Sequence, residues 1–248
     1  MVFIMLLLAS LAGGVLCVLL AATLLAFRSR RLGLLLPRLI SFSTGTLLGT
    51  ALLGMIPHAA ARLEMADVSL LLLAGLALFF FLEKILIWRH CHRKDCDFHA
   101  GSGPLLLIGD SVHNLIDGVV LASAFMASPT LGIAAAVSTI AHEVPQELGE
   151  FVVYLHAGYS RKRALLLNVL SSLTSVVGAL LGWFFLSAAR EAGPYLLAIA
   201  AAGFLYVALA DLVPSQRGKS SLAATLLDLL LTVLGVAVTW LATRGHSG

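Results

Sequence analysis

Long apolar stretches occupy nearly all of this chain, and they leave few ways for it to fold. A helix that crosses a bilayer needs about 20 mostly apolar residues. Reading between polar breaks gives eight such stretches, at roughly residues 2–27, 39–60, 68–88, 104–127, 131–156, 162–188, 194–213 and 222–243. The sequence therefore predicts an all-α polytopic membrane protein with eight transmembrane helices.

The composition agrees with this prediction. Hydrophobic residues make up 60% of the 248 positions and charged residues only 12%, whereas a soluble domain is about a quarter charged. These values exclude a soluble enzyme, a disordered chain and a nucleic-acid-binding domain. The lipid bilayer is the expected surrounding, and no nucleic acid is an expected partner. Because every polar loop is short, residues 1–248 are expected to form a single transmembrane domain.

The basic residues are distributed unevenly among the loops. With eight spans, 12 of the 16 Lys and Arg residues lie in the loops that share one side, and three lie on the other side. Cytoplasmic loops carry the excess of Lys and Arg in membrane proteins. We therefore expect both termini outside the cytoplasm, in a plasma membrane and specifically a bacterial inner membrane.

Two pairs of segments repeat each other. The fourth and fifth spans carry the pattern His-polar-x-x-polar at 113–117 and 142–146, and the second and seventh spans end in Ala-Leu-x-x-apolar-apolar-Pro at 51–57 and 208–214. In each pair, one span runs outward and the other inward. This arrangement is typical of an inverted-repeat transporter whose substrate site lies near the membrane midplane.

Polar side chains concentrate in the fourth and fifth spans, at spacings of three and four residues that place neighbours on one helix face. These side chains are Asp110, His113, Asn114 and Asp117 in the fourth span, and His142, Glu143, Gln146, Glu147 and Glu150 in the fifth. Neither cluster contains a Lys or Arg. An ionised group costs roughly 2.5–3.5 kcal/mol at the centre of a span. The compensating charge must therefore come from a bound cation, from protons or from water in a cavity.

Two imidazoles beside carboxylates and amide oxygens form a ligand set for a divalent transition metal. Pro145 strengthens this interpretation, because it cannot bond to the carbonyl of Ala141 and so frees that oxygen within the cluster. A polar packing network between helices is the alternative, although such networks usually use only one or two Ser, Thr or Asn residues.

With these residues the chain resembles the ZIP (Zrt/Irt-like) family of metal-ion transporters. His-Asn-x-x-Asp-Gly at 113–118 and His-Glu-x-Pro-x-Glu at 142–147 are similar to the family's two signature helices, and 148–151, 158–168 and 203–214 resemble its LIV-1-like branch. The resemblance implies a 3+2+3 arrangement of spans, an ion path between spans two, four, five and seven, and a homodimer. It implies movement of a metal ion into the cytoplasm without ATP, so we expect neither enzymatic activity nor a catalytic cofactor.

The resemblance also implies two ligand sets. His113, Asp117, His142 and Gln146 would form the primary metal site. Asn114, Asp117 and Glu143 would form a neighbouring second site, with Asp117 bridging the two. Zn²⁺ is the leading candidate for the transported ion, and Fe²⁺, Mn²⁺ and Cd²⁺ remain open.

Further residues are candidates for the path outside this centre. Glu147 and Asp110 extend the two polar clusters. His58 follows Pro57 at the outer end of the second span, where it could receive an ion or cap the helix. Asp211 lies near the inner end of the seventh span and could line the exit. A cytoplasmic loop at 89–103 is either a labile metal site or simply solvated, and it contains His90, Cys91, His92, Cys96 and His99.

The function we expect is secondary transport of a divalent transition-metal ion into the cytoplasm by alternating access. Two alternatives remain open. His142-Glu143 begins like the His-Glu-x-x-His motif of zinc proteases, but Gln146 occupies the fifth position. An intramembrane zinc metalloprotease would therefore need a histidine from the fourth span. A non-transporting metal sensor would bind the ion without moving it.

Overall fold

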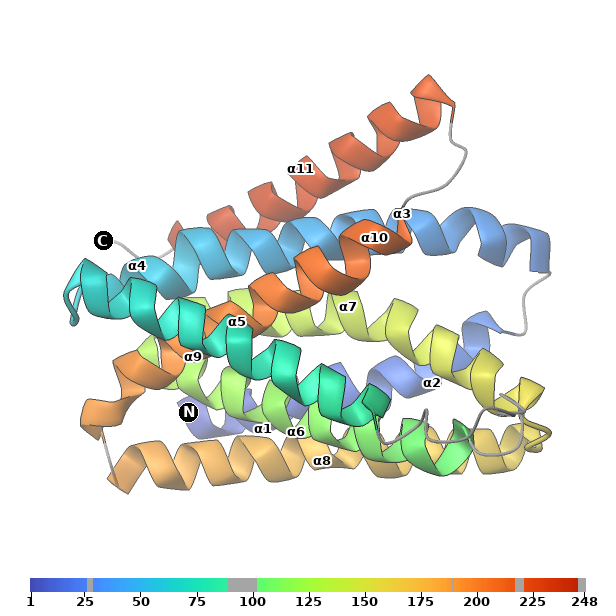
Figure 1. Cartoon of the computed structure of the whole chain (residues 1–248), viewed down its shortest axis with the longest axis horizontal. Coiled ribbons are helices and arrows are strands. Elements are labelled where there is room, and N and C mark those ends of the chain that lie inside the picture. The colour runs from blue at the N-terminus through green and yellow to red at the C-terminus, as the bar shows by residue number, and fades with distance from the viewer. Residues whose placement is uncertain (26–28, 89–101, 189, 217–220, 245–248) are drawn as a thin grey trace.

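The computed structural model describes all of the chain except residues 26–28, 89–101, 189, 217–220 and 245–248. The described residues form helices and turns and contain no strand. Most of the helices run side by side along the long axis of the molecule (Figure 1). The predicted all-α polytopic fold is therefore confirmed.

Eight helical units make up the described part of the chain. The first unit contains α1 (Val2–Leu11), η1 (Ala12–Leu16) and α2 (Cys17–Leu24). The second contains α3 (Ser29–Gly49), η2 (Thr50–Met55) and α4 (Ile56–Ala60). The next four are the single helices α5 (Met65–Trp88), α6 (Ser102–Ala127), α7 (Pro129–His156) and α8 (Arg161–Ala188). After η3 (Arg190–Ala192), the seventh unit contains α9 (Gly193–Tyr206), η4 (Val207–Leu212) and α10 (Val213–Ser215), and the last is α11 (Leu222–Arg244).

Seven of these units include a helix that is long and apolar enough to cross a membrane. The exception among the described units is α7, because the polar residues in its central and C-terminal parts lower its mean hydropathy. α7 packs against α2, α3, α6 and α11, so its polar face is shielded from lipid, and we count it as the eighth crossing. The first helix begins and the last helix ends at the same end of the bundle, as an even number of crossings requires (Figure 1).

The helices begin and end close to the predicted spans, with one difference in the second unit. The second span is predicted to begin near residue 39, but α3 begins at Ser29 and continues through Pro37. Proline in a helix interior removes one backbone hydrogen bond. Pro37 lies at the start of the apolar segment 35–60, where water at the membrane face can satisfy the freed carbonyl.

The units pack in two groups of four. In one group, α6 packs along α8, and both α7 and α8 pack along the first unit. In the other group, α3 packs along α11 and α5 packs along α9. The groups meet chiefly where α7 contacts α3 and α11, and where α6 contacts α9.

These contacts repeat in the way that an inverted repeat requires. In such a repeat, units one to three correspond to units six to eight, and unit four corresponds to unit five. The contact of α6 (unit four) with α8 (unit six) therefore corresponds to the contact of α7 (unit five) with the first unit, and both contacts are present. In the same way, the contact of α3 with α11 corresponds to the contact of α9 with α5. The pairing of helices in space therefore agrees with the repeat seen in the sequence.

The two segments with the repeated Ala-Leu pattern also share an unusual backbone. η2 and η4 are both π-helical, and each leads into a helix with proline in its first turn, Pro57 and Pro214 respectively. π-helical turns are rare, and they occur frequently at functional sites. The repeat thus extends to the local conformation of the second and seventh units.

Glycines allow α6 and α8 to approach each other closely. A Cβ atom at Gly118 would collide with the backbone oxygen of Ser175, and a Cβ atom at Gly178 would collide with the backbone oxygen of Leu115. Small residues at such contacts let helix backbones pack directly against each other in membranes. This contact fixes the position of α6, which carries half of the candidate site.

We therefore expect Gly178→Ala to lower the free energy of unfolding by about 1–3 kcal/mol, because the added methyl group overpacks the contact. Gly109→Ala is the matched control, since a Cβ atom there meets nothing within 4 Å. Alanine should leave stability at this position unchanged or raise it by up to about 1 kcal/mol. Thermal unfolding in detergent measures both variants, and equal effects would contradict the role given to the contact.

Candidate metal centre

The polar residues of α6 form one buried stripe. Asp110, Asn114 and Asp117 are buried, while the His113 side chain is 23% exposed. The Asn114 amide nitrogen donates to Asp110 Oδ1 at 2.9 Å, which fixes both side chains on the helix face. The i, i+3 and i+4 spacings of the sequence therefore do place these side chains together.

On α7, His142 is oriented by its own helix. Its Nδ1 lies 2.9 Å from the backbone oxygen of Ser138. Because a carbonyl can only accept a hydrogen bond, Nδ1 carries the proton. Nε2 therefore points away from α7 and lies 3.0 Å from Asp117 Oδ2 on α6. A histidine whose other nitrogen is held by a backbone carbonyl is the usual arrangement of a metal ligand.

Four side chains from the two helices converge on one point. His113, Asp117, His142 and Glu143 each offer a ligand atom, and these atoms all lie within 4.8 Å of one another. His113 Nε2 is 3.6 Å from Glu143 Oε1, and His142 Nε2 is 3.8 Å from the same oxygen. Ligand atoms of a tetrahedral zinc site lie about 3.3 Å apart. We call these four residues the primary cluster.

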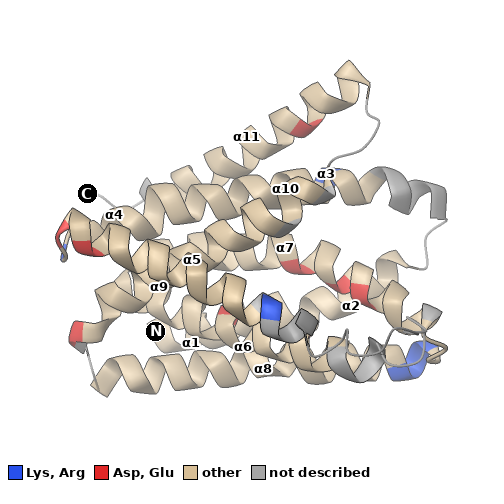
Figure 2. Cartoon of the chain, in the orientation of Figure 1, with Lys and Arg blue, Asp and Glu red and all other residues tan. Residues whose placement is uncertain are grey.

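The primary cluster lacks other partners. Among the described residues, its metal-facing atoms make no hydrogen bond, and every recorded ion pair joins a histidine to a carboxylate. The acidic residues of α7 lie within the length of the bundle rather than at its ends (Figure 2). Carboxylates buried in this way need a compensating charge. A divalent cation held by two imidazoles and two carboxylates would supply it.

Gln146 lies next to the primary cluster, but its amide nitrogen points elsewhere. It faces Asp110 Oδ1 and Glu150 Oε1, at 3.4 Å from each. Asn114 likewise faces Asp110. The assignment of Gln146 and Asn114 as metal ligands therefore stays a prediction. The side chains of Asp110 and Glu147, the other two candidates on these helices, are buried in the bundle interior.

The remaining predicted residues lie away from the primary cluster or outside the described structure. His58 lies in α4, and its Nδ1 is 3.0 Å from the backbone oxygen of Gly54, as expected of a histidine that bonds to its own helix. The backbone of Asp211 lies in η4, but its side chain is outside the described part. The candidate loop ligands lie outside the described residues, and they are His90, Cys91, His92, Cys96 and His99.

The carbonyl that Pro145 frees has a partner that the sequence did not indicate. The Ser43 hydroxyl on α3 donates to the backbone oxygen of Ala141. In this conformation that oxygen is therefore engaged by a neighbouring helix. Pro145 signals that a donor is needed, but no periodicity in the sequence identifies a residue 98 positions away.

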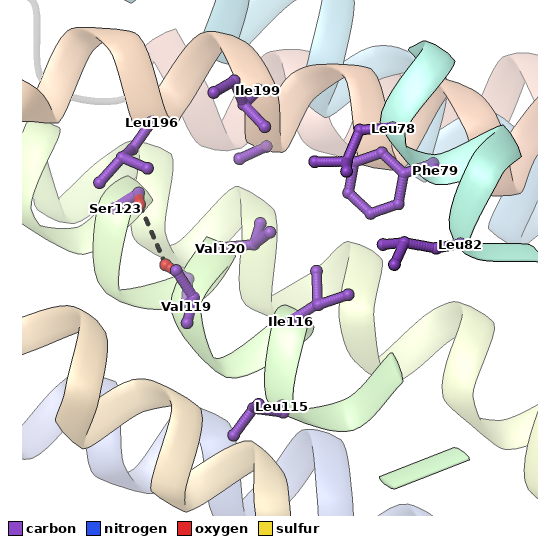
Figure 3. A pocket seen from close by; sticks show the side chains of 11 residues that line it. Leu78, Phe79, Leu82, Leu115, Ile116, Val119, Val120, Ser123, Leu196 and Ile199 are labelled. Atoms are coloured by element: carbon purple, nitrogen blue, oxygen red, sulfur yellow. Dashed lines mark hydrogen bonds between the residues drawn. The ribbon is translucent and has the colours of Figure 1, made fainter. Parts of the chain in front are cut away.

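Two pockets lie on the side of the primary cluster that faces α5 and α9. The larger, of about 260 Å³, has apolar side chains apart from Ser123, whose hydroxyl donates to the backbone oxygen of Val119 (Figure 3). It therefore offers no metal ligand. The smaller, of about 190 Å³, shares part of this lining and reaches His113 and Asp117. The primary cluster is thus accessible between the two helix groups.

Comparison with known proteins gives consistent similarities. Residues 89–243 match the family profile described as ZIP Zinc transporter. Zinc transporter ZIP4 of Mus musculus is 41% identical over 129 residues, which cover 52% of this chain and 19% of the relative. Zinc transporter ZIP10 of Mus musculus is 38% identical over 112 residues, or 45% of this chain and 13% of the relative. Zinc transporter ZIP13 of Pongo abelii is 28% identical over 222 residues, or 82% and 65%. The chain spans about a fifth or less of the first two relatives' length.

The geometry predicts that the purified chain binds Zn²⁺ through His142. His142→Ala removes an oriented ligand and should weaken the binding at least about tenfold, since even losing a residue that only supports a ligand costs 10–100-fold. Glu64→Gln is the control, because Glu64 is an exposed acid in the connection between α4 and α5. Isothermal titration of both variants in detergent provides the measurement. Equal affinities in the two variants would contradict the assignment.

Proposed function

This chain belongs to the ZIP zinc transporter family, and we propose that it is a secondary transporter that moves a divalent transition-metal ion across the membrane into the cytoplasm. One observation carries the proposal. Two imidazoles and two carboxylates from α6 and α7 converge within 4.8 Å inside a bundle of membrane-crossing helices. Such a site can hold a metal ion within the thickness of the bilayer.

The surroundings of the primary cluster favour transport over permanent binding. A structural zinc site is closed, with all of its ligands enclosed by protein. Here the His113 side chain is 23% exposed and lines a pocket between the two helix groups. An ion bound there can exchange with that pocket. Alternating access would then open the primary cluster to one side of the membrane at a time, which is the common mechanism of inverted-repeat transporters.

The direction and setting of transport form part of the proposal. The excess of Lys and Arg in alternate loops supports a cytoplasmic location for those loops and an outside location for both termini. Transport into the cytoplasm, a plasma membrane location and assembly into a homodimer are carried over from the resemblance in sequence. The metal ion is the substrate of this process and the proposal requires no catalytic cofactor.

The protease alternative gains no support from the described residues. The fifth position of the His-Glu-x-x-His pattern holds Gln146, and its amide nitrogen faces two carboxylates. Because a zinc protease motif supplies both imidazoles from one helix, the primary cluster differs from it: His142 comes from α7 and His113 from α6. A sensor would use the same ligands, so metal flux is the property that separates a sensor from a transporter.

Proteoliposomes containing the purified chain should take up Zn²⁺. Uptake should fall to the level of empty liposomes in His113→Ala and Glu143→Gln, because the first removes a ligand of the primary cluster and the second removes the negative charge of another. Glu64→Gln is the matched control, since Glu64 is an exposed acid in the connection between α4 and α5. Unchanged uptake in both ligand variants would refute transport through this cluster, and binding without uptake in the unmodified protein would favour the sensor.

Competition among metals identifies the preferred ion. We expect unlabelled Zn²⁺ to compete with radioactive Zn²⁺ better than Mn²⁺ does, because two imidazoles suit zinc and manganese prefers oxygen ligands. We also expect slower uptake at pH 5.5 than at pH 7.5, since imidazoles must lose a proton before they bind a metal. Fe²⁺ and Cd²⁺ complete the comparison. Stronger competition by Mn²⁺ than by Zn²⁺ would overturn the assignment of the leading ion.

A further inference from the structure

A second group of buried acids lies on one side of the primary cluster. Asp110 precedes His113 by about one turn of α6, and Glu147 and Glu150 follow Glu143 by about one and two turns of α7. Because the two helices run in opposite directions, these three residues lie toward the same end of the bundle. In the predicted orientation this is the cytoplasmic end. We call the three acids the inner cluster.

The inner cluster is buried without adequate partners. Asp110, Glu147 and Glu150 are 3%, 0% and 8% exposed. Within the described structure, Asp110 Oδ2, both carboxylate oxygens of Glu147 and Glu150 Oε2 accept no hydrogen bond. No Lys or Arg forms a recorded ion pair with them. Buried carboxylates without partners are costly unless a cation or a proton compensates their charge.

An independent observation on a third helix points to the same place. Asn168 on α8 is fully buried, and neither its side-chain oxygen nor its nitrogen has a hydrogen-bond partner among the described residues. Its side chain faces the Glu147 carboxylate. An amide buried without partners costs roughly 1–3 kcal/mol. Its amide group therefore borders the inner cluster, where its oxygen, after a rotation of the amide, can serve as a ligand.

The inverted repeat has no equivalent of the inner cluster on the outer side. The repeat aligns His113 with His142, so Glu147 and Glu150 on α7 correspond to Gly118 and Leu121 on α6. Neither of those residues can bind a cation. The acids thus break the symmetry of the two halves, and the path from the primary cluster toward the cytoplasm differs chemically from the path toward the outside.

Two amides connect the inner cluster to the primary cluster. The Gln146 nitrogen lies 3.4 Å from Asp110 Oδ1 and from Glu150 Oε1, and the Asn114 nitrogen lies 2.9 Å from Asp110 Oδ1. Among the described residues, only the primary cluster brings three or more His or carboxylate ligand atoms within 4.8 Å of one another. The three inner acids are not brought together as closely as the primary cluster, so water would complete the coordination of a cation there.

We propose that Asp110, Glu147 and Glu150, with the oxygen of Asn168, form a second binding site for a divalent cation that keeps part of its water. The proposal rests on the proposed transport function, in which this site receives the ion from the primary cluster. Carboxylate and amide oxygens suit hard or hydrated cations, whereas imidazole suits zinc. Zn²⁺ is therefore held less tightly here than by the two histidines, which favours its release toward the cytoplasm.

The number of bound ions tests the proposal directly. Purified full-length protein in nanodiscs is dialysed against Zn²⁺, bound metal is counted by mass spectrometry, and X-ray absorption reports imidazole ligands. The unmodified chain should bind two Zn²⁺ ions. Glu147→Gln with Glu150→Gln should bind one and retain the imidazole signal. His113→Ala with His142→Ala should also bind one but lose that signal.

The control and a second variant make the result decisive. Glu64→Gln with Glu191→Gln changes two exposed acids in the same way and should leave both ions bound. Asn168→Asp adds a charged ligand and should tighten the weaker site at least about threefold, which decides the matter if the double glutamine variant does not fold. Two ions bound by the Glu147/Glu150 variant, one ion bound by the unmodified chain, or an unchanged weaker site in Asn168→Asp would each overturn the proposal.

Failure of this proposal can be distinguished from failure of the transport proposal. If the unmodified chain takes up no metal in liposomes, transport is wrong whatever the number of bound ions. If it takes up Zn²⁺ while the Glu147/Glu150 variant still binds two ions, transport stands and only the inner site is wrong. The two measurements use the same preparation of protein.

Discussion

Negative charge buried without positive side chains is the constraint on which this structure depends. Five carboxylates lie in the interior of α6 and α7, and the ion pairs recorded in the described residues involve only histidine. Such groups cannot face lipid. The bundle therefore places α6 and α7 in contact with each other and surrounds them with apolar helices, whose Leu and Phe side chains make up most of the exposed apolar surface. In the proposed function, a bound cation offsets the remaining charge.

The inverted repeat explains where the charge is buried, and its departures explain why the two ends differ. The repeat brings the His-polar-x-x-polar segments of α6 and α7 together at the middle of the bundle, and it gives η2 and η4 the same π-helical backbone. A fully symmetric bundle would bind an ion equally well toward either side. Glu147 and Glu150, which correspond to Gly118 and Leu121, remove that equality.

Sequence patterns predicted the helices and the convergence of His113 with His142, because hydropathy sets the spans and helical spacing sets the face. They could not predict contacts between distant helices. Pro145 indicates that the Ala141 carbonyl needs a donor, but only the packing of α3 on α7 brings Ser43 to it. Gln146 stays a predicted ligand through its oxygen, and the sequence could not show that its nitrogen faces Asp110 and Glu150 on two different helices.

The contacts within a helix group differ from the contacts between the two groups. Within one group, glycines of α6 and α8 bring the backbones so close that a Cβ atom at Gly118 or Gly178 would collide with the facing helix. Between the groups, buried apolar contacts such as Leu47 with the core of α7 are joined by single hydroxyls. Ser138 of α7 donates to the Thr46 carbonyl of α3 at 2.9 Å and shares a hydrogen bond with Thr50 of η2 at 2.6 Å. Such bonds average about 0.6 kcal/mol in membranes and can be exchanged for similar ones. Because alternating access requires bodies that stay rigid and a boundary that rearranges, the α3–α7 boundary is where the proposed movement costs least.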